Sequence, residues 1–271
     1  MLKDITLGQF FPGKSPIHRM DPRVKLVLTI AFIVMLFMAK NMWGLLIGVA
    51  FTLISFAISR IPLSMMLKGL KPVVAIVIFT GALNILFVRT GDPIFEWHIL
   101  KITYDGINTA IFMVVRIVCL IVGSSLLTYT TSPIALTDAI ERLMSPLKKI
   151  KVPVHELAMI MTIALRFIPT LIEETDKIMS AQKARGSEMD TGSFMDKVKG
   201  MIPIFIPLFV SSFRRAEELA TAMECRCYRG GEGRTRMKQL RTSAVDYAGC
   251  VYTAAFIAAV IVMNIMFKAS I

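Results

Sequence analysis

One stretch near the start of the chain has the spacing of a nucleotide-binding loop. Residues 8–15 are GQFFPGKS, which fits the phosphate-loop pattern G-x-x-x-x-G-K-S. In that loop an apolar strand leads into the motif, and a helix that follows it directs N–H groups at the phosphates. Here no such strand precedes the motif, Pro16 stands where the helix should begin, and no Walker B acid follows an apolar strand elsewhere. We therefore predict that this stretch binds no nucleotide.

Thiols and imidazoles are the other groups that could carry out chemistry. Cys225 and Cys227 are separated by one residue, but a structural zinc site needs four ligands, and no histidine or second cysteine pair lies near them. We expect all four cysteines to be reduced and none to bind a metal. His18, His98 and His155 are isolated, so no nucleophile can be paired with a base. The sequence therefore predicts that the chain is not an enzyme.

The composition requires lipid around much of the chain and water around the rest. Hydrophobic residues make up 55% of the 271 positions, whereas a soluble domain has about 45–50%. The formal net charge is +12, from 31 Lys and Arg against 19 Asp and Glu, and these charges need a water-facing part. The basic residues are interspersed with acids and follow the side of the membrane discussed below, so we expect no nucleic-acid partner.

Five segments are apolar enough to be membrane spans. They are residues 24–39, 42–59, 72–88, 107–129 and 247–267. The first is short, and we expect the side chain of Lys25 to reach from it to the membrane interface. Arg116 is a charge inside the fourth segment. The sequence leaves open whether Arg116 binds helix ends and headgroups or has a functional role.

Lys and Arg residues are concentrated in cytoplasmic loops of membrane proteins, and this rule predicts the orientation. With the N-terminus in the cytoplasm, most basic residues outside the spans lie on that side. Only Lys40, Arg89, Lys101 and Lys268 then fall outside. The C-terminus is accordingly predicted to lie outside.

The predicted organisation has three parts: a membrane domain at 1–131, a cytoplasmic coupling region at 132–243 and a last transmembrane helix at 244–271. The coupling region is too charged for the bilayer, and we expect two long amphipathic helices in it. The apolar stripe of the first is Leu171, Ile172, Thr175, Ile178, Met179 and Gln182, and that of the second is Phe213, Ala216, Leu219, Ala220, Met223 and Cys227. Between them, residues 201–210 contain two prolines and are predicted to form a separate interfacial segment.

Both amphipathic helices are expected to end at an arginine. The candidate residues are Ala184, Arg185 and Gly186 at the first end, and Cys225, Arg226 and Cys227 at the second. An arginine at a helix C-terminus can simply complement the helix dipole. Alternatively, two similar ends are two docking points for a soluble partner with two similar sites, such as a dimeric motor.

Four motifs together resemble the transmembrane T component of energy-coupling factor (ECF) transporters, the EcfT/CbiQ-like family of vitamin and metal importers. They are GQFFPGKSPIHRMDPR at 8–23, TTSP at 130–133, LRFIP at 165–169 and AQKARG at 181–186. The resemblance implies an all-α polytopic membrane protein in which two long coupling helices cross beneath the membrane.

The resemblance also implies the partners. The T component of this family assembles in the prokaryotic cell membrane with two ABC-type ATPases and a small membrane S component that binds the vitamin or other micronutrient. ATP and magnesium are bound by the ATPases, so no cofactor is expected in this chain. The residues at the two arginine ends would dock on the ATPases, the second end more loosely because it departs from Ala-Arg-Gly on both sides of Arg226. The open alternative is a stand-alone secondary transporter, which would need its own polar binding site.

Overall fold

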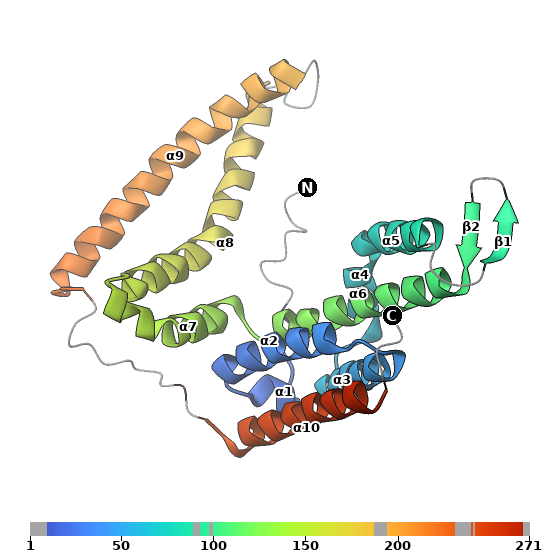
Figure 1. Ribbon diagram of the computed structural model, residues 1–271. Coiled ribbons are helices and arrows are strands. Elements are labelled where there is room, and N and C mark those ends of the chain that lie inside the picture. Colours follow the sequence, from blue (N-terminus) through green and yellow to red (C-terminus); the bar gives the residue numbers. More distant parts are fainter. Residues whose placement is uncertain are drawn as a thin grey trace. The chain divides into compact units, whose positions relative to one another are not determined.

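The computed structural model describes residues 10–88, 93–97, 100–186, 194–230, 240 and 242–267. These residues form helices and one β-hairpin (Figure 1). In chain order the elements are α1 (Pro16–Arg19), α2 (Pro22–Met38), α3 (Met42–Ser59), α4 (Leu63–Leu70), the 3-10 turn Lys71–Val73, α5 (Val74–Phe87), β1 (Pro93–Trp97), β2 (Leu100–Thr103), α6 (Tyr104–Thr130), α7 (Pro133–Leu143), the 3-10 turn Ser145–Ile150, α8 (Val154–Ala184), α9 (Phe194–Cys225) and α10 (Ala244–Met266). The predicted all-α fold is confirmed, with a short antiparallel hairpin between α5 and α6 as the addition.

The chain divides into two compact units. The main unit comprises Gly8–Ala139 and Gln239–Ile271 and includes the β-hairpin. The second unit comprises Met1–Leu7 and Ile140–Lys238. The division after residue 139 falls inside α7. The placement of residues 132–243 in the cytoplasm stays a prediction.

Among the described residues, five helical segments are long and apolar enough to cross a membrane: α3, Leu63–Phe87, α6, α8 and α10. Four of them correspond to predicted spans. The other predicted span, 24–39, is α2, whose 17 residues extend about 25 Å at 1.5 Å per residue. The fifth segment is α8, which was predicted to be an amphipathic helix and has the length and composition of a span as well. The chain is thus a multi-pass membrane protein with more apolar helix than the sequence pattern indicated.

Aromatic side chains hold the core of the main unit together. The ring of Phe51 on α3 stacks on Phe32 of α2 at 5.1 Å and on Tyr252 of α10 at 4.9 Å between centroids. Phe112 and Cys119 of α6 are buried in the same cluster. Helices α2, α3, α6 and α10 therefore form one packed body, although α10 is far from the others in the sequence.

Replacing Gly123 by alanine is expected to destabilise this body. A Cβ atom at Gly123 of α6 would lie 2.1 Å from Cε1 of Phe32, a core residue that is 2% exposed. Overpacking of this kind costs about 1–3 kcal/mol. Gly81→Ala on α5 is the matched control, because its Cβ would meet Val114 at 3.3 Å. Thermal unfolding of both variants in detergent measures the difference, and equal midpoints would contradict the expectation.

Helix α9 corrects two predictions. Residues 201–210 are not a separate interfacial segment, because α9 runs through them with Pro203 and Pro207 inside the helix. The face that packs on α8 carries Ile204, Leu208, Ser211 and Arg215. Of the predicted stripe, Leu219 and Met223 are half-buried, whereas Phe213, Ala216, Ala220 and Cys227 are exposed. On α8 the predicted stripe is confirmed, since all six of its residues are half-buried.

Candidate docking sites at the helix ends

The second unit is built on the antiparallel pair of helices α8 and α9 (Figure 1). The carboxylate of Glu174 on α8 accepts hydrogen bonds from Ser211 Oγ and, at 3.0 Å, from Arg215 Nη2 on α9. Eight residues further along α8, Gln182 Nε2 donates to the carbonyl oxygen of Pro203 at 3.3 Å. On α9 the partner of Gln182, Pro203, lies eight residues before the partner of Glu174, Ser211. Both contacts therefore belong to one antiparallel register.

The first arginine end closes α8 with a tight turn. Ala184 is the last helical residue, and the backbone N–H of Arg185 donates to the carbonyls of Ala181 and Gln182 at 3.2 and 3.1 Å. Gly186 follows with φ +82°, in the left-handed region that glycine tolerates. The side chains of this end are exposed.

The second arginine end repeats this geometry. Cys225 is the last residue of α9, the N–H of Arg226 donates to the carbonyl of Met223 at 3.1 Å, and Cys227 follows with φ 55°. All three residues are exposed. The left-handed position after the arginine is what the two ends share, and it explains why glycine stands there in one of them.

Exchanging the residue types at these left-handed positions is expected to have opposite effects. Gly186→Ala should destabilise the last turn of α8 by about 1–2 kcal/mol, whereas Cys227→Gly should stabilise the last turn of α9. Hydrogen exchange of the amides in each last turn measures both changes. Effects of the same sign would show that the backbone conformation at one of these ends differs from the structure.

The structure separates the two ends rather than bringing them together. Arg185 lies beside the start of α9, and Arg226 lies at the far end of that helix (Figure 1). From Pro203, opposite Gln182, to Arg226 the axis of α9 rises about 35 Å. Within the described part of the chain, neither guanidinium forms a hydrogen bond or ion pair, so both are available to a partner.

Two cations tie the ends of α2 and α6 in the main unit. Lys25 Nζ of α2 donates to the carbonyl oxygen of Thr130, the last residue of α6, at 2.9 Å. Arg116 Nη2 of α6 donates to the carbonyl oxygen of Ala39, just after α2, at 2.5 Å. Fourteen residues, or about 21 Å of helix, separate the two contacts on each helix.

These contacts bear on two expectations from the sequence. The side chain of Lys25 is buried at 6% exposure against the carbonyls at the end of α6, and its position relative to the membrane interface stays a prediction. Arg116 binds a helix end and lies 4.4 Å from the ring centroid of Phe112, which is the structural role that the sequence had left open. Both cations sit where the α-helix dipole is negative or a carbonyl lacks an N–H partner.

A carboxylate that the sequence reasoning missed joins the N-terminal segment to α10. Asp246 is 2% exposed and accepts from the backbone N–H of Asp21 at 2.7 Å and from that of Ser243 at 2.6 Å. Asp21 caps α2 and pairs with Arg23 at 2.6 Å. The local signal was available as the Ser-x-x-Asp spacing at 243–246, which is typical of a capping box. The contact of Asp246 with Asp21, 225 residues away, has no such local signal in the sequence.

The charge on Asp21 depends on its arginine partner. Burial alone would raise the pKa of this carboxyl group. Hydrogen bonds and the positive charge of Arg23 outweigh that effect and lower the pKa below its usual value. The ion pair at the start of α2 is therefore maintained at neutral pH.

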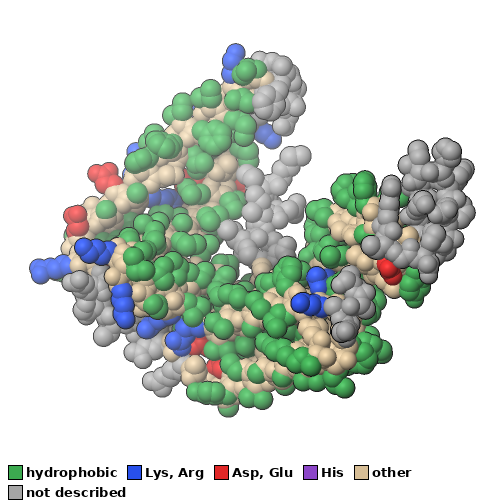
Figure 2. Space-filling view, viewed as in Figure 1, with side chains coloured by type: hydrophobic (Ala, Val, Ile, Leu, Met, Phe, Trp, Pro, Cys, Tyr) green, Lys and Arg blue, Asp and Glu red, His purple; other side chains and the backbone are tan. Residues whose placement is uncertain are grey.

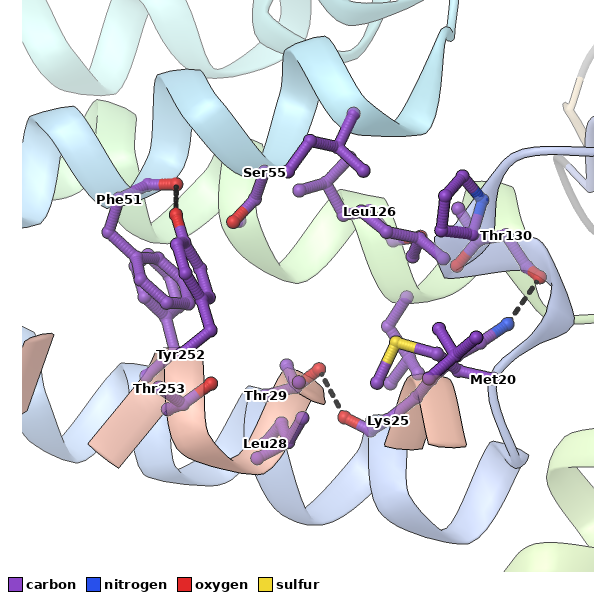
Figure 3. A pocket seen from close by; sticks show the side chains of 18 of the residues that line it. Met20, Lys25, Leu28, Thr29, Phe51, Ser55, Leu126, Thr130, Tyr252 and Thr253 are labelled. Atoms are coloured by element: carbon purple, nitrogen blue, oxygen red, sulfur yellow. Dashed lines mark hydrogen bonds between the residues drawn. The ribbon is translucent and has the colours of Figure 1, made fainter. Parts of the chain in front are cut away.

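A cavity of about 280 Å³ lies within the main unit, walled by α1, α2, α3, α6 and α10 (Figure 3). Its lining is mostly apolar. The hydroxyls of Thr29, Thr52 and Thr130 donate to backbone carbonyls of their own helices, and Tyr252 donates to the carbonyl of Phe51 at 3.3 Å. The cavity thus offers few polar groups for holding a charged solute.

The remaining sequence predictions concern metals and nucleotides. The described residues contain no group of three or more His, Cys, Asp or Glu side chains that could hold a metal ion, and Cys119, Cys225, Cys227 and Cys250 are free thiols. Gly8 of the loop-like motif lies outside the described residues. Ser15 caps α1, which is only four residues long.

Comparison with known proteins gives the family. A family model described as CbiQ, cobalt transport protein, matches residues 13–237. The energy-coupling factor transporter transmembrane protein EcfT of Ruminiclostridium cellulolyticum is 55% identical over 267 residues, which cover 98% of this chain and all of the relative. The EcfT protein of Clostridium kluyveri is 54% identical over 91% of this chain and 92% of its own length, and that of Bacillus subtilis is 47% identical over 91% and 93%.

The match spans both units and includes both arginine ends. With five apolar helices of spanning length and relatives in bacteria, the chain is a bacterial multi-pass membrane protein involved in transport. It belongs to the CbiQ family, with the EcfT transmembrane proteins of energy-coupling factor transporters as its relatives.

Proposed function

We propose that this chain is the non-catalytic scaffold of an ATP-driven ECF-type importer, and that it couples two ABC-type ATPases to a separate S component that binds a vitamin or another micronutrient. The observation that carries the proposal is the pair of arginine ends. Both are exposed, both have a left-handed residue after the arginine, and they lie at opposite ends of α9. Two equivalent ATPase subunits would present two equivalent sites to them.

Arginine suits a docking role of this kind. Its guanidinium presents a rigid set of donors that fits carboxylates, and its charge does not titrate. The helices behind each arginine are continuous over 31 and 32 residues through their internal prolines, so a displacement at either end can be passed along one helix. Closure of the ATPase dimer would therefore move α8 and α9 as levers.

The S component would contact an apolar surface of the chain. The face of α9 turned away from α8 exposes large hydrophobic side chains, among them Met201, Ile202, Phe205, Ile206 and Phe209. Figure 2 shows hydrophobic side chains over much of the visible surface of the chain, with Lys and Arg concentrated at a few places. Methionine and phenylalanine can adapt to partners of different shape, which suits a surface that accepts more than one S component.

The secondary-transporter alternative has one observation in its favour, the cavity of the main unit. Of the polar groups that line it, the hydroxyls of Thr29, Thr52, Thr130 and Tyr252 donate to backbone carbonyls, and Lys25 makes its closest contact with the carbonyl of Thr130. A transporter that binds its own polar solute needs free donors or acceptors in the site. The cavity therefore supports the alternative less well than the two arginine ends support the scaffold.

The test is to purify the tagged protein from its native membranes in mild detergent and to identify the bound proteins by mass spectrometry. Two ABC-type ATPase chains and one or more small membrane proteins are expected, and the identity of the latter reveals the substrate class. Recovery of the chain alone, with ATP-independent uptake after reconstitution, would establish the secondary transporter instead.

A further inference from the structure

Two prolines leave a backbone acceptor free in the middle of α9. In an α-helix the N–H of each residue donates to the carbonyl four residues earlier, and proline has no N–H. Pro207 therefore cannot donate to the carbonyl of Pro203, although both residues are inside the helix. One intrahelical hydrogen bond is therefore missing at this exposed point of α9, and the carbonyl takes a donor from outside the helix.

Helix α8 supplies the missing donor. The side-chain amide of Gln182 donates to the Pro203 carbonyl at 3.3 Å. Gln182 is half-buried and lies three residues before Arg185, so the bond is made at the docking end of α8. A glutamine is suited to this position because its amide donates without adding a charge.

Among the residues that the structure describes, the bond is one of two polar contacts that fix how α8 and α9 pair. The other is formed by Glu174 with Ser211 and Arg215, about two turns away in the same register. Between the two contacts lie apolar side chains, including Ile204, which is 7% exposed. Apolar contacts alone tolerate sliding of one helix along another, whereas these two polar contacts exist in a single register.

We propose that Gln182 is a positioning residue that sets the register of α8 against α9 by binding the free carbonyl of Pro203, and so fixes the spacing between Arg185 and Arg226. This inference rests on the proposed docking function of the two arginines. A slip of one residue would move the two ends by about 1.5 Å relative to each other, and a slip of one turn by about 5 Å. The two sites of an ATPase dimer have a fixed spacing. If the spacing between Arg185 and Arg226 changed, the chain could bind one of these sites but not both at once.

Two variants separate positioning from simple stabilisation. Gln182→Leu removes the donor and keeps the size of the side chain. Pro207→Ala supplies an N–H to the Pro203 carbonyl from within α9, which should raise the unfolding temperature while it competes with Gln182. If Gln182 only stabilises the helices, Pro207→Ala should improve stability and leave coupling intact. Positioning predicts that both variants lower transport per ATP hydrolysed, by about three- to tenfold for the loss of one hydrogen bond.

The register itself is measured without the ATPases. Spin labels are placed at the exposed positions Lys177 and Thr221 in the full-length protein in lipid nanodiscs, with the exposed native cysteines replaced by serine. Electron–electron double resonance should give one narrow distance in the unmodified background and a shifted or broadened distribution in both variants. Ser180→Ala is the control, because Ser180 is exposed and, among the described residues, its hydroxyl donates to the carbonyl of Asp176 in its own helix.

Each outcome has a defined meaning. Unchanged distances in Gln182→Leu would overturn the proposal, and so would changed distances with unaltered coupling. If the unmodified protein binds no ATPase, the proposed function fails, and the distance measurement still reports on the register.

Discussion

The double variant Arg185→Ala, Arg226→Ala is expected to lose its ATPases during purification and to lose ATP-driven uptake. Removing one partner of a buried charged contact costs about 2–5 kcal/mol, so each single variant should weaken assembly at least tenfold and the double variant more than either. The chain should still fold, since both side chains are exposed and form no hydrogen bond or ion pair within the described residues. The measurements are the ATPase retained after affinity purification and the uptake of the micronutrient in cells.

Arg214→Ala is the matched control for that experiment. Arg214 is an exposed arginine of the same helix, eleven residues before the end of α9. The Arg214→Ala variant should retain the ATPases, because we expect the loss of ATPase binding to come from the two arginine ends and not from a general loss of positive charge. Undiminished uptake in the double variant would refute docking through these arginines.

Asp246→Asn is expected to destabilise the main unit by about 3 kcal/mol. Both carboxylate oxygens of Asp246 accept backbone N–H groups, and hydrogen bonds to a charged group contribute about 1.5–3 kcal/mol each. The amide of asparagine would place an NH₂ group against one of these N–H donors, which leaves a buried donor without an acceptor. Thermal unfolding in detergent and the yield of folded protein measure the effect.

Asp105→Asn provides the comparison for Asp246. Asp105 also lies in the first turn of a spanning helix, α6, but its side chain is exposed. Loss of an acid at a helix N-terminus costs about 0.3–1 kcal/mol, so this variant should unfold close to the parent. A similar shift in both variants would mean that the helix dipole, rather than the contact with Asp21, accounts for the role of Asp246.

Much of the candidate docking site was predictable because helix ends are local. The last turn of a helix is set by a few consecutive residues, so the glycine after Arg185 indicated an end at that position. The second end was predicted from the run of residues around Arg226, although Cys227 carries a side chain in a conformation that favours glycine. The shared left-handed position became visible only with the backbone angles.

The continuity of α9 shows where local reasoning failed. Two prolines four residues apart predict a break, because each removes an intrahelical hydrogen bond. The helix continues, and the carbonyl of Pro203 is satisfied by Gln182, a residue of another helix. The packed face of α9 was misjudged for the same reason, since a helix with apolar residues on several sides does not reveal from its own sequence which side meets α8.

The sequence by itself determined which segments are helical and apolar, how the charges are distributed and where the two arginine ends lie, because hydropathy and capping are properties of neighbouring residues. Only the tertiary structure decided the partners of Lys25, Arg116 and Asp246. Each of the three has a backbone partner between 77 and 225 positions away in the chain, in addition to the local contact of Asp246 with Ser243. Backbone groups are the same at every residue, so no side-chain pattern identifies which one a buried charge will meet.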